Sequence, residues 1–312
     1  MPRQATRLVI AALITAALSA CAQSSYQTTP ANLGQPVASS AMEALIDQPG
    51  PIELKTIVSA DWVADLSGLL NLKDPKAVQA GLKDHEEPIQ IYTHLLRHPT
   101  QGFFMVDTGV SKRLVADPAG VGVGLVVRNF AKIEKMQIRE DALSAIRSAG
   151  VPLKGVFMTH IHLDHISGMP DVPKDVPFYT GPGEAAEKKF ENMFVQGMEN
   201  RFFDGRPAIR EFQFTKDPDG KLDGVIDVFG DGSFYAIFSP GHTAGHLAFV
   251  ARTTTGPVLL TGDTCHTRWG WEHGVEPGSY TFEREAERKS LLALKALSER
   301  HPKMIVRLGH QP

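Results

Sequence analysis

Four side chains able to bind metal ions fall within six residues, His160-Ile161-His162-Leu163-Asp164-His165. Imidazole and carboxylate ligands hold Zn²⁺ at about 2.0–2.2 Å, and a catalytic zinc site usually keeps three protein ligands and one open position. Four ligands therefore exceed the needs of one such site. Because side chains alternate along an extended segment, His160 and His162 share one side. Asp164 and His165 are expected to turn away from each other where a helix begins, so one turn would serve two ions.

Three apolar segments end on further metal-capable residues. The segment GVFMT leads into His160, PVLLTG into Asp263 and MIVRLG into His310. Functional sites in α/β folds gather where strands end. Burying so many unpaired ligand-type side chains beside apolar strands would be costly, and a metal ion removes that cost.

The elements that must position these residues are short strands separated by Gly and Pro, with helices between some of them. Strand pairs precede helices in both halves, which predicts two sheets stacked face to face with helices outside. Two turns, Arg97–Thr100 and Gly230-Asp231-Gly232, predict hairpins. The predicted strands are 52–58, 89–96, 102–106, 155–158, 177–180, 225–229, 234–238, 246–251, 257–261 and 304–308, and the predicted helices are 139–149, 183–200 and 282–299.

The overall composition is that of a globular protein. The chain has 312 residues, of which 42% are hydrophobic and 21% charged, with a formal net charge of −3 and only two cysteines, Cys21 and Cys265. These values exclude disordered, collagenous and disulfide-stapled classes. The absence of a basic cluster argues against a nucleic-acid partner.

The N-terminus has the pattern of an export signal. Arg3 and Arg7 precede the apolar run 8–18, which is too short to span a membrane. The sequence Leu18-Ser19-Ala20-Cys21 resembles the lipobox of bacterial lipoproteins, which implies cleavage before Cys21, acylation of its sulfur and, with Ala22 next, sorting to the periplasmic side of the outer membrane. The alternative is a plain signal peptide and a periplasmic protein.

This pattern divides the chain into three parts. Residues 1–20 are the predicted lipoprotein signal peptide. Residues 21–51, rich in Gln, Ser, Thr, Ala and Pro, are predicted to be a flexible tether. Residues 52–312 are predicted to form one domain.

The motifs resemble those of the metallo-β-lactamase superfamily. HIHLDH resembles its HxHxDH signature, Ser239–His246 its PGHTxGH loop, Thr261-Gly262-Asp263 its GD motif, and Gly309-His310 its final histidine. The resemblance implies an α/β fold of the four-layer αββα type, with a dimetal site at the strand ends. It also implies seven ligands: His160, His162 and His242 for one metal, Asp164, His165 and His310 for the other, and Asp263 as the bridge.

The metal and the remaining histidines are less closely specified. Zinc is the expected metal, although His and Asp ligands also suit iron, manganese and cobalt. His246 either supports a ligand or simply begins the strand LAFVA, and the second is favoured. His94, His98 and His301 are predicted to be packed or solvated.

The resemblance implies hydrolysis. Two ions would share a bridging hydroxide, and Asp164 would position that nucleophile or pass a proton to the leaving oxygen. There is no G-x-S-x-G nucleophile elbow.

Segments IYTHLL and QGFFMVDTG resemble N-acyl-homoserine lactonases, so the expected small-molecule substrate is an ester or lactone. Those enzymes have a tyrosine three residues after the bridging aspartate; here His266 takes that place and can donate a hydrogen bond to an oxyanion.

Several alternatives remain open. A thioesterase of the glyoxalase II type would need a C-terminal domain, but only about 47 residues separate Asp263 from His310. Asp263 also argues against a β-lactam substrate, and a phosphoester is a further possibility. A noncatalytic metal-binding lipoprotein would be expected to have broken ligands, and none is broken. Trp269 and Trp271 either line the pocket mouth or pack internally. Acyl-chain preference and oligomeric state are not specified.

Overall fold

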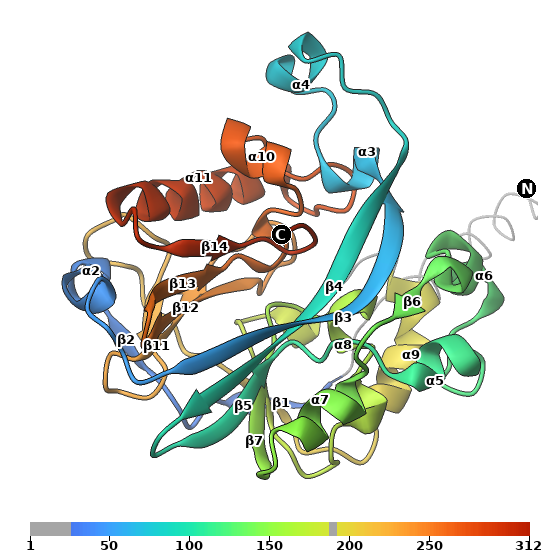
Figure 1. Ribbon diagram of the computed structural model, residues 1–312, viewed down its shortest axis with the longest axis horizontal. Helices are drawn as coiled ribbons and strands as arrows, with labels where there is room; N and C mark the ends of the chain where they lie inside the picture. The colour runs from blue at the N-terminus through green and yellow to red at the C-terminus, as the bar shows by residue number, and fades with distance from the viewer. Residues whose placement is uncertain (1–25, 187–191) are drawn as a thin grey trace, which may run out of the picture.

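Two mixed β-sheets lie face to face in the computed structural model, which describes residues 26–186 and 192–312 (Figure 1). The eight-stranded sheet has the order β1 (Thr28–Pro30), β9 (Ile209–Glu211), β8 (Phe178–Thr180), β7 (Leu153–Phe157), β5 (Gly102–Val106), β4 (Glu86–His98), β3 (Glu53–Asp65), β6 (Gln137–Ile138). The six-stranded sheet has the order β14 (Ile305–Arg307), β13 (Gly256–Leu260), β12 (Leu247–Thr253), β11 (Phe234–Phe238), β10 (Val225–Asp227), β2 (Gln35–Val37).

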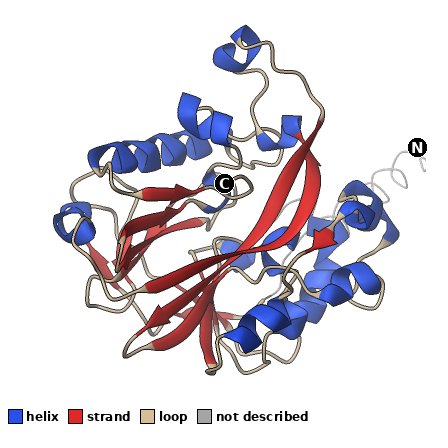
Figure 2. Ribbon diagram, in the orientation of Figure 1, coloured by secondary structure: helices blue, strands red, loops and turns tan. Residues whose placement is uncertain are grey.

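Helices cover the outer face of each sheet (Figure 2). Helices α2 (Ser39–Ile46) and α11 (Arg284–Arg300) pack on the six-stranded sheet through a shared apolar cluster. The eight-stranded sheet is covered by α5 (Lys112–Ala116), α6 (Leu125–Phe130), α7 (Ala142–Ser148), α8 (Leu163–Ile166) and α9 (Asn192–Phe203). The remaining helices are α3 (Leu66–Leu69), α4 (Pro75–Gln79) and α10 (Arg268–His273), with 3₁₀ turns η1 (Ile133–Lys135), η2 (Met169–Asp171), η3 (Glu184–Ala186) and η4 (Gly262–Thr264).

Aromatic side chains fill the space between the two sheets. Phe157 of β7 contacts the rings of Phe104, Phe234 and Phe249 at centroid separations of 5.2–6.1 Å. All four are buried, as expected where alternating residues of two sheets face each other. The predicted αββα sandwich is therefore confirmed.

Most predicted elements are present, with changed ends. Both hairpins form, between β4 and β5 and between β10 and β11. The first predicted strand, 52–58, continues to Asp65, because a register shift between Val58 and Ala60 lets β3 stay paired with β4. In place of one helix over 183–200, the structure has η3 and then α9, which runs to Phe203; residues 187–191 between them lie outside the described part.

The prediction of a flexible tether over 21–51 is wrong for its described part. Strand β1 pairs with β9, and β2 pairs with β10. Met42 and Ile46, four residues apart on α2, are fully buried against the six-stranded sheet. The Ser39 side chain and backbone N–H both donate to Asp217. Composition alone suggested too little apolar surface, but two side chains on one helical face are enough when the sheet supplies the partner surface.

The predicted signal peptide and Cys21 lie outside the described residues. Within residues 26–186 and 192–312, no helix combines the length and apolar character needed to cross a bilayer.

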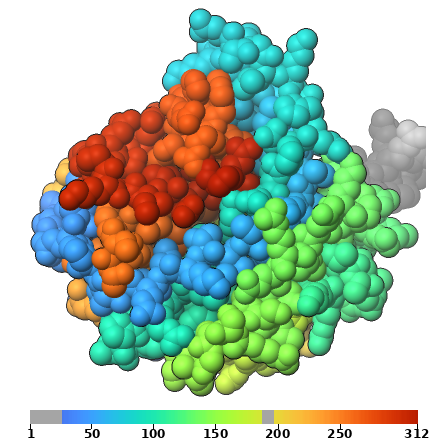
Figure 3. Space-filling view, in the orientation of Figure 1, coloured from blue at the N-terminus to red at the C-terminus, as the bar shows by residue number. Residues whose placement is uncertain are grey.

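At one end of the molecule, the α3–α4 segment lies beside α10 (Figure 3). There, Lys76 donates a hydrogen bond to the backbone oxygen of His273, and Asn71 donates one to Glu276.

Candidate metal centre

Strand ends and the loops after them bring the seven predicted ligands together. His160 follows β7, His162 is the N-cap residue of α8, and Asp164 and His165 lie on that helix. His242 lies in the loop between β11 and β12, Asp263 lies in η4 after β13, and His310 follows β14. Because β13 and β14 are parallel, Asp263 and His310 meet at the same edge of the sheet.

The seven predicted ligands fall into two neighbouring groups, one of His160, His162 and His242, the other of Asp164, His165, Asp263 and His310; a third group, which overlaps both, adds His266 to His242 and Asp263. In the first, His242 Nε2 lies 2.9 Å from His162 Nδ1. In the second, His310 Nε2 lies 3.1 Å from Asp164 Oδ2. The division matches the one that the family resemblance implied.

Asp263 lies between the two groups. Its Oδ1 is 3.3 Å from His165 Nε2, while its Oδ2 is 3.2 Å from His310 Nε2 and 3.5 Å from His242 Nε2. One carboxylate therefore reaches ligands of both groups, as a bridging ligand must.

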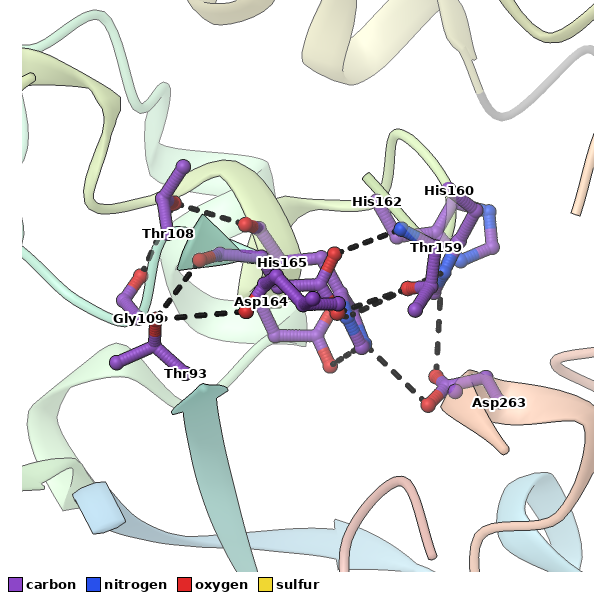
Figure 4. Close-up of polar contacts among 12 residues, drawn as sticks. Thr93, Thr108, Gly109, Thr159, His160, His162, Asp164, His165 and Asp263 are labelled. Atoms are coloured by element: carbon purple, nitrogen blue, oxygen red, sulfur yellow. Dashed lines mark hydrogen bonds and ion pairs between the residues drawn. The ribbon is translucent and has the colours of Figure 1, made fainter. Parts of the chain in front are cut away.

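The expectation that Asp164 and His165 turn away from each other is wrong. Their Oδ2 and Nε2 atoms lie 3.7 Å apart and belong to the same group, and Figure 4 shows them side by side with Asp263 opposite. The first turn of a helix can point neighbouring residues toward one partner when the preceding segment bends, which strand alternation does not describe.

Burial and opposite charges shift the titration of these groups. Burial opposes ionisation of Asp164, but His165 and His310 outweigh it and lower the pKa of Asp164 to about 2. Burial likewise opposes protonation of His310, but Asp263 and Asp164 raise its pKa to about 10. Burial lowers the pKa of His160 well below its ordinary value. The carboxylates are thus ionised, and a cation is favoured among them.

Several buried ligand atoms of the cluster lack a hydrogen-bond partner. Within the described residues, His160 Nε2, His165 Nε2 and Asp263 Oδ1 make no hydrogen bond, although each is shielded from solvent. Buried polar atoms without partners are rare and costly. Imidazole nitrogens and carboxylate oxygens are the ligands of zinc and related divalent ions, so the donor set fits a pair of such ions.

Asp107, which the sequence analysis did not identify, supports His165 from behind. Its Oδ2 accepts from His165 Nδ1 at 2.8 Å and from the Thr159 hydroxyl at 2.9 Å, and its Oδ1 accepts from Thr159 N–H at 2.8 Å. The backbone of Asp107 is left-handed, with φ of 55°. The polar run Asp107-Thr108-Gly109 directly after an apolar strand was the available signal.

Glu184 of η3 was also missed, and it joins the two histidine loops. Its Oε1 accepts from Ile161 N–H at 2.7 Å, and its Oε2 accepts from the Thr243 hydroxyl at 2.7 Å and Gly245 N–H at 3.0 Å. The carboxylate thereby ties the loop of His160 and His162 to the loop of His242.

His246 holds the loop of Asp263. Its Nε2 accepts from Asp263 N–H at 3.0 Å, and its Nδ1 lies 2.9 Å from the Ser239 hydroxyl. Burial lowers the pKa of His246 to about 3, so Nε2 stays available as an acceptor. Gly262 must be small here, because a Cβ would lie 2.7 Å from His246 Nε2. His246 does directly precede β12, but it also positions Asp263, so the favoured interpretation of a mere strand start was incomplete.

His266 is buried beside the cluster. Its Nε2 lies 3.1 Å from Asp263 Oδ2, and its Nδ1 lies 3.2 Å from the backbone oxygen of Leu69. The other histidines expected outside the site lie outside it: His94 contacts Thr56, His98 contacts Asp231, and His301 contacts Asp47.

A cavity of about 590 Å³ opens over the cluster. His162, Asp164, His242, Asp263, His266 and His310 form its polar end, and its apolar walls include Trp62, Leu69, Ile89, Val127, Phe130 and Phe282. Trp269 and Trp271 are not among its lining residues; Trp271 packs with α11 and Trp269 stacks on His273. Of the two alternatives for that tryptophan pair, internal packing is correct.

Comparison with known proteins identifies the protein family to which the chain belongs. A family model described as the metallo-beta-lactamase superfamily matches residues 87–310. The N-acyl homoserine lactonases AttM of Agrobacterium fabrum and Rhizobium johnstonii are 29% and 30% identical over 255 and 252 residues, covering 79% of this chain and 91% of each relative. A crystal structure of Bacillus thuringiensis AiiA, a mutant with N-decanoyl-L-homoserine bound at the active site, is similar in fold, with TM-score 0.60 and 19% identity over 85% of this chain and 94% of that one.

The chain belongs to the metallo-beta-lactamase superfamily. It is a hydrolytic enzyme of that superfamily, and its homologues include lactonases.

Proposed function

We propose that this protein hydrolyses the ring ester of an N-acyl-homoserine lactone or a similar amphiphilic lactone. The observation that carries the proposal is the lining of the cavity of about 590 Å³, which combines five of the seven predicted ligands with apolar side chains such as Trp62, Leu69 and Ile89. Such a volume suits a small molecule with a polar head and an acyl chain. The lactonase relatives support the same substrate class.

The site would hold two divalent ions, with zinc as the expected metal. His160, His162 and His242 would bind one, Asp164, His165 and His310 the other, and Asp263 both. When bound, such a pair lowers the pKa of water and polarises the carbonyl and leaving oxygens.

Asp164 is the residue that we expect to transfer the proton from the attacking water to the leaving oxygen. Its side chain is 17% exposed and lines the cavity, whereas Asp263 is only 3% exposed. In lactone hydrolysis a water oxygen bonds to the carbonyl carbon, the ring C–O bond breaks, and the departing alkoxide takes up a proton. Asp164 would accept the proton of the attacking water and deliver it to that alkoxide.

The test is a substrate panel. The chain without residues 1–21, which keeps every described residue, is assayed for bound metal and for turnover of an N-acyl-homoserine lactone, a thioester, a β-lactam and a phosphodiester. We expect two metals per chain and lactone hydrolysis, lost in Asp263→Asn and retained in the exposed control His273→Gln. Turnover of another substrate with the lactone untouched would refute the lactonase assignment, and fewer than two metals without turnover would refute the dimetal enzyme.

We further propose that the protein is exported and anchored by a lipid on Cys21 at the periplasmic side of the outer membrane. The support is the sequence pattern of residues 1–22; two anchoring signals or several acyl chains hold a protein stably where one does not. Cell fractionation tests this. Cys21→Ser should move the protein from the membrane fraction to another fraction, while Cys265→Ser should not; retention of Cys21→Ser in the membrane fraction would refute the anchor.

A further inference from the structure

The ring of His266 is held in the same way as the ring of His310. His310 Nδ1 lies 3.0 Å from the backbone oxygen of Gln90, and its Nε2 lies 3.2 Å from Asp263 Oδ2. His266 Nδ1 lies 3.2 Å from the backbone oxygen of Leu69, and its Nε2 lies 3.1 Å from the same Asp263 oxygen. Both side chains are almost fully buried, at 3% and 1% exposure. A predicted ligand and a residue outside the ligand set therefore share one arrangement.

The contact with Leu69 decides which ring nitrogen of His266 carries the hydrogen. A carbonyl oxygen can only accept, so Nδ1 must be the donor. With its hydrogen on Nδ1, the ring turns Nε2 toward Asp263 Oδ2, which lies 3.1 Å away. An imidazole nitrogen and a carboxylate oxygen at this separation can bind the same divalent ion. Metal-binding histidines typically donate their second ring N–H to a carbonyl or carboxylate in this way.

A third neighbour completes a possible ligand set. The ligand atoms of His242, Asp263 and His266 all lie within 4.8 Å of one another, and the rings of His242 and His266 are 5.2 Å apart and nearly perpendicular. These distances are short enough for one ion bound by His242 and Asp263 to reach His266 as well.

We propose that His266 is an additional metal ligand, binding a divalent ion through Nε2 together with His242 and Asp263. This inference rests on the metal site of the proposed function. It assigns His266 a role that differs from hydrogen bonding to the substrate, because an Nε2 atom that binds a metal ion carries no hydrogen to donate.

The experiment compares metal binding in the wild type with His266→Phe and His266→Gln. Phe keeps a flat ring without nitrogen, and Gln keeps a hydrogen-bond donor that is a poor metal ligand. Each protein is loaded with Co²⁺; the visible absorption spectrum reports the ligand geometry, and competition with a chelator reports the affinity of each ion. We expect both variants to alter the spectrum and to weaken the binding of one ion by more than the roughly 10- to 100-fold that is typical when only a residue supporting a ligand is lost.

The experiment has one control that should leave metal binding unchanged and one that should alter it. His273→Phe removes a histidine of the same segment whose Nδ1 also contacts a backbone oxygen, that of Trp269, but which is exposed and outside the cavity; it should leave spectrum and affinity unchanged. His310→Gln removes a predicted ligand and should alter both. The melting temperature of each metal-free variant, if close to that of the wild type, shows that folding is retained.

The proposal is overturned if His266→Phe and His266→Gln bind both ions with wild-type spectrum and affinity. Loss of turnover with unchanged metal binding would place His266 on the substrate instead. Absence of lactonase activity in the wild type would refute the proposed substrate but would leave these metal measurements, and hence the role of His266, to be judged separately.

Discussion

Asp107 offers the sharpest test of how the metal centre is supported. Asp107→Asn keeps the size of the side chain, and Asn tolerates the left-handed backbone at this position. The amide oxygen can still accept from Thr159 N–H, but the amide NH2 that replaces Oδ2 can accept from neither the Thr159 hydroxyl nor His165 Nδ1. The substitution therefore removes the acceptor that orients the His165 ring.

The size of the effect can be estimated in two ways. A hydrogen bond to a charged group contributes about 1.5–3 kcal/mol, and the hydrogen bond that this substitution removes, from His165 Nδ1 to Asp107 Oδ2, is short at 2.8 Å and buried. Removal of residues that support a metal ligand typically weakens metal binding about 10- to 100-fold, which corresponds to about 1.4–2.8 kcal/mol. The two estimates agree, so we expect the ion held by His165 to bind about 10- to 100-fold more weakly.

Chelator competition on the loaded protein measures this weakening. Asp231→Asn is the matched control, because Asp231 Oδ2 contacts His98 Nε2 at the same distance of 2.8 Å outside the metal-binding groups; it should leave metal affinity unchanged. If Asp107→Asn binds both ions as tightly as the wild type, the inference that Asp107 orients a metal ligand is wrong.

Three other features of the structure give further predictions. Because Asp263 and Asp164 raise the pKa of His310 to about 10, metal binding near pH 7 must displace a proton, so affinity should rise by about tenfold per pH unit per proton toward pH 10; titration calorimetry that finds no pH dependence would contradict this. Met42→Ala should lower the free energy of unfolding by about 2–5 kcal/mol, since Met42 is fully buried, whereas Val78→Ala at an exposed site should change it little in urea titrations. Phe130→Ala should raise KM for long-chain more than for short-chain lactones by shortening the apolar wall; equal effects on both would count against a role in chain binding.

The sequence by itself identified the residues of the candidate metal centre. His160, His162, Asp164 and His165 are neighbours in the chain, so a single bend places them together in any compact fold. Asp263 and His310 end apolar strands, which periodicity reveals. The hairpins and the helix α11 were likewise predictable, because turn chemistry and apolar spacing act over a few residues.

Only the tertiary structure decided what supports those residues. Asp107 lies 58 residues from His165, and Leu69 lies 197 residues from His266; no local spacing relates them, because sheet order sets such pairs. Burial then sets the strength of these contacts, because water would screen them at the surface of the protein but does not reach them in its interior.

The N-terminal segment illustrates the same limit. Residues 28–46 contain few apolar side chains and look flexible in isolation, yet strands β1 and β2 find partners in β9 and β10. A sheet edge provides hydrogen bonds that the segment's own sequence does not encode. The local sequence therefore specified the donors of the metal centre, and the topology of the two sheets decided which distant groups orient them and where the folded domain begins.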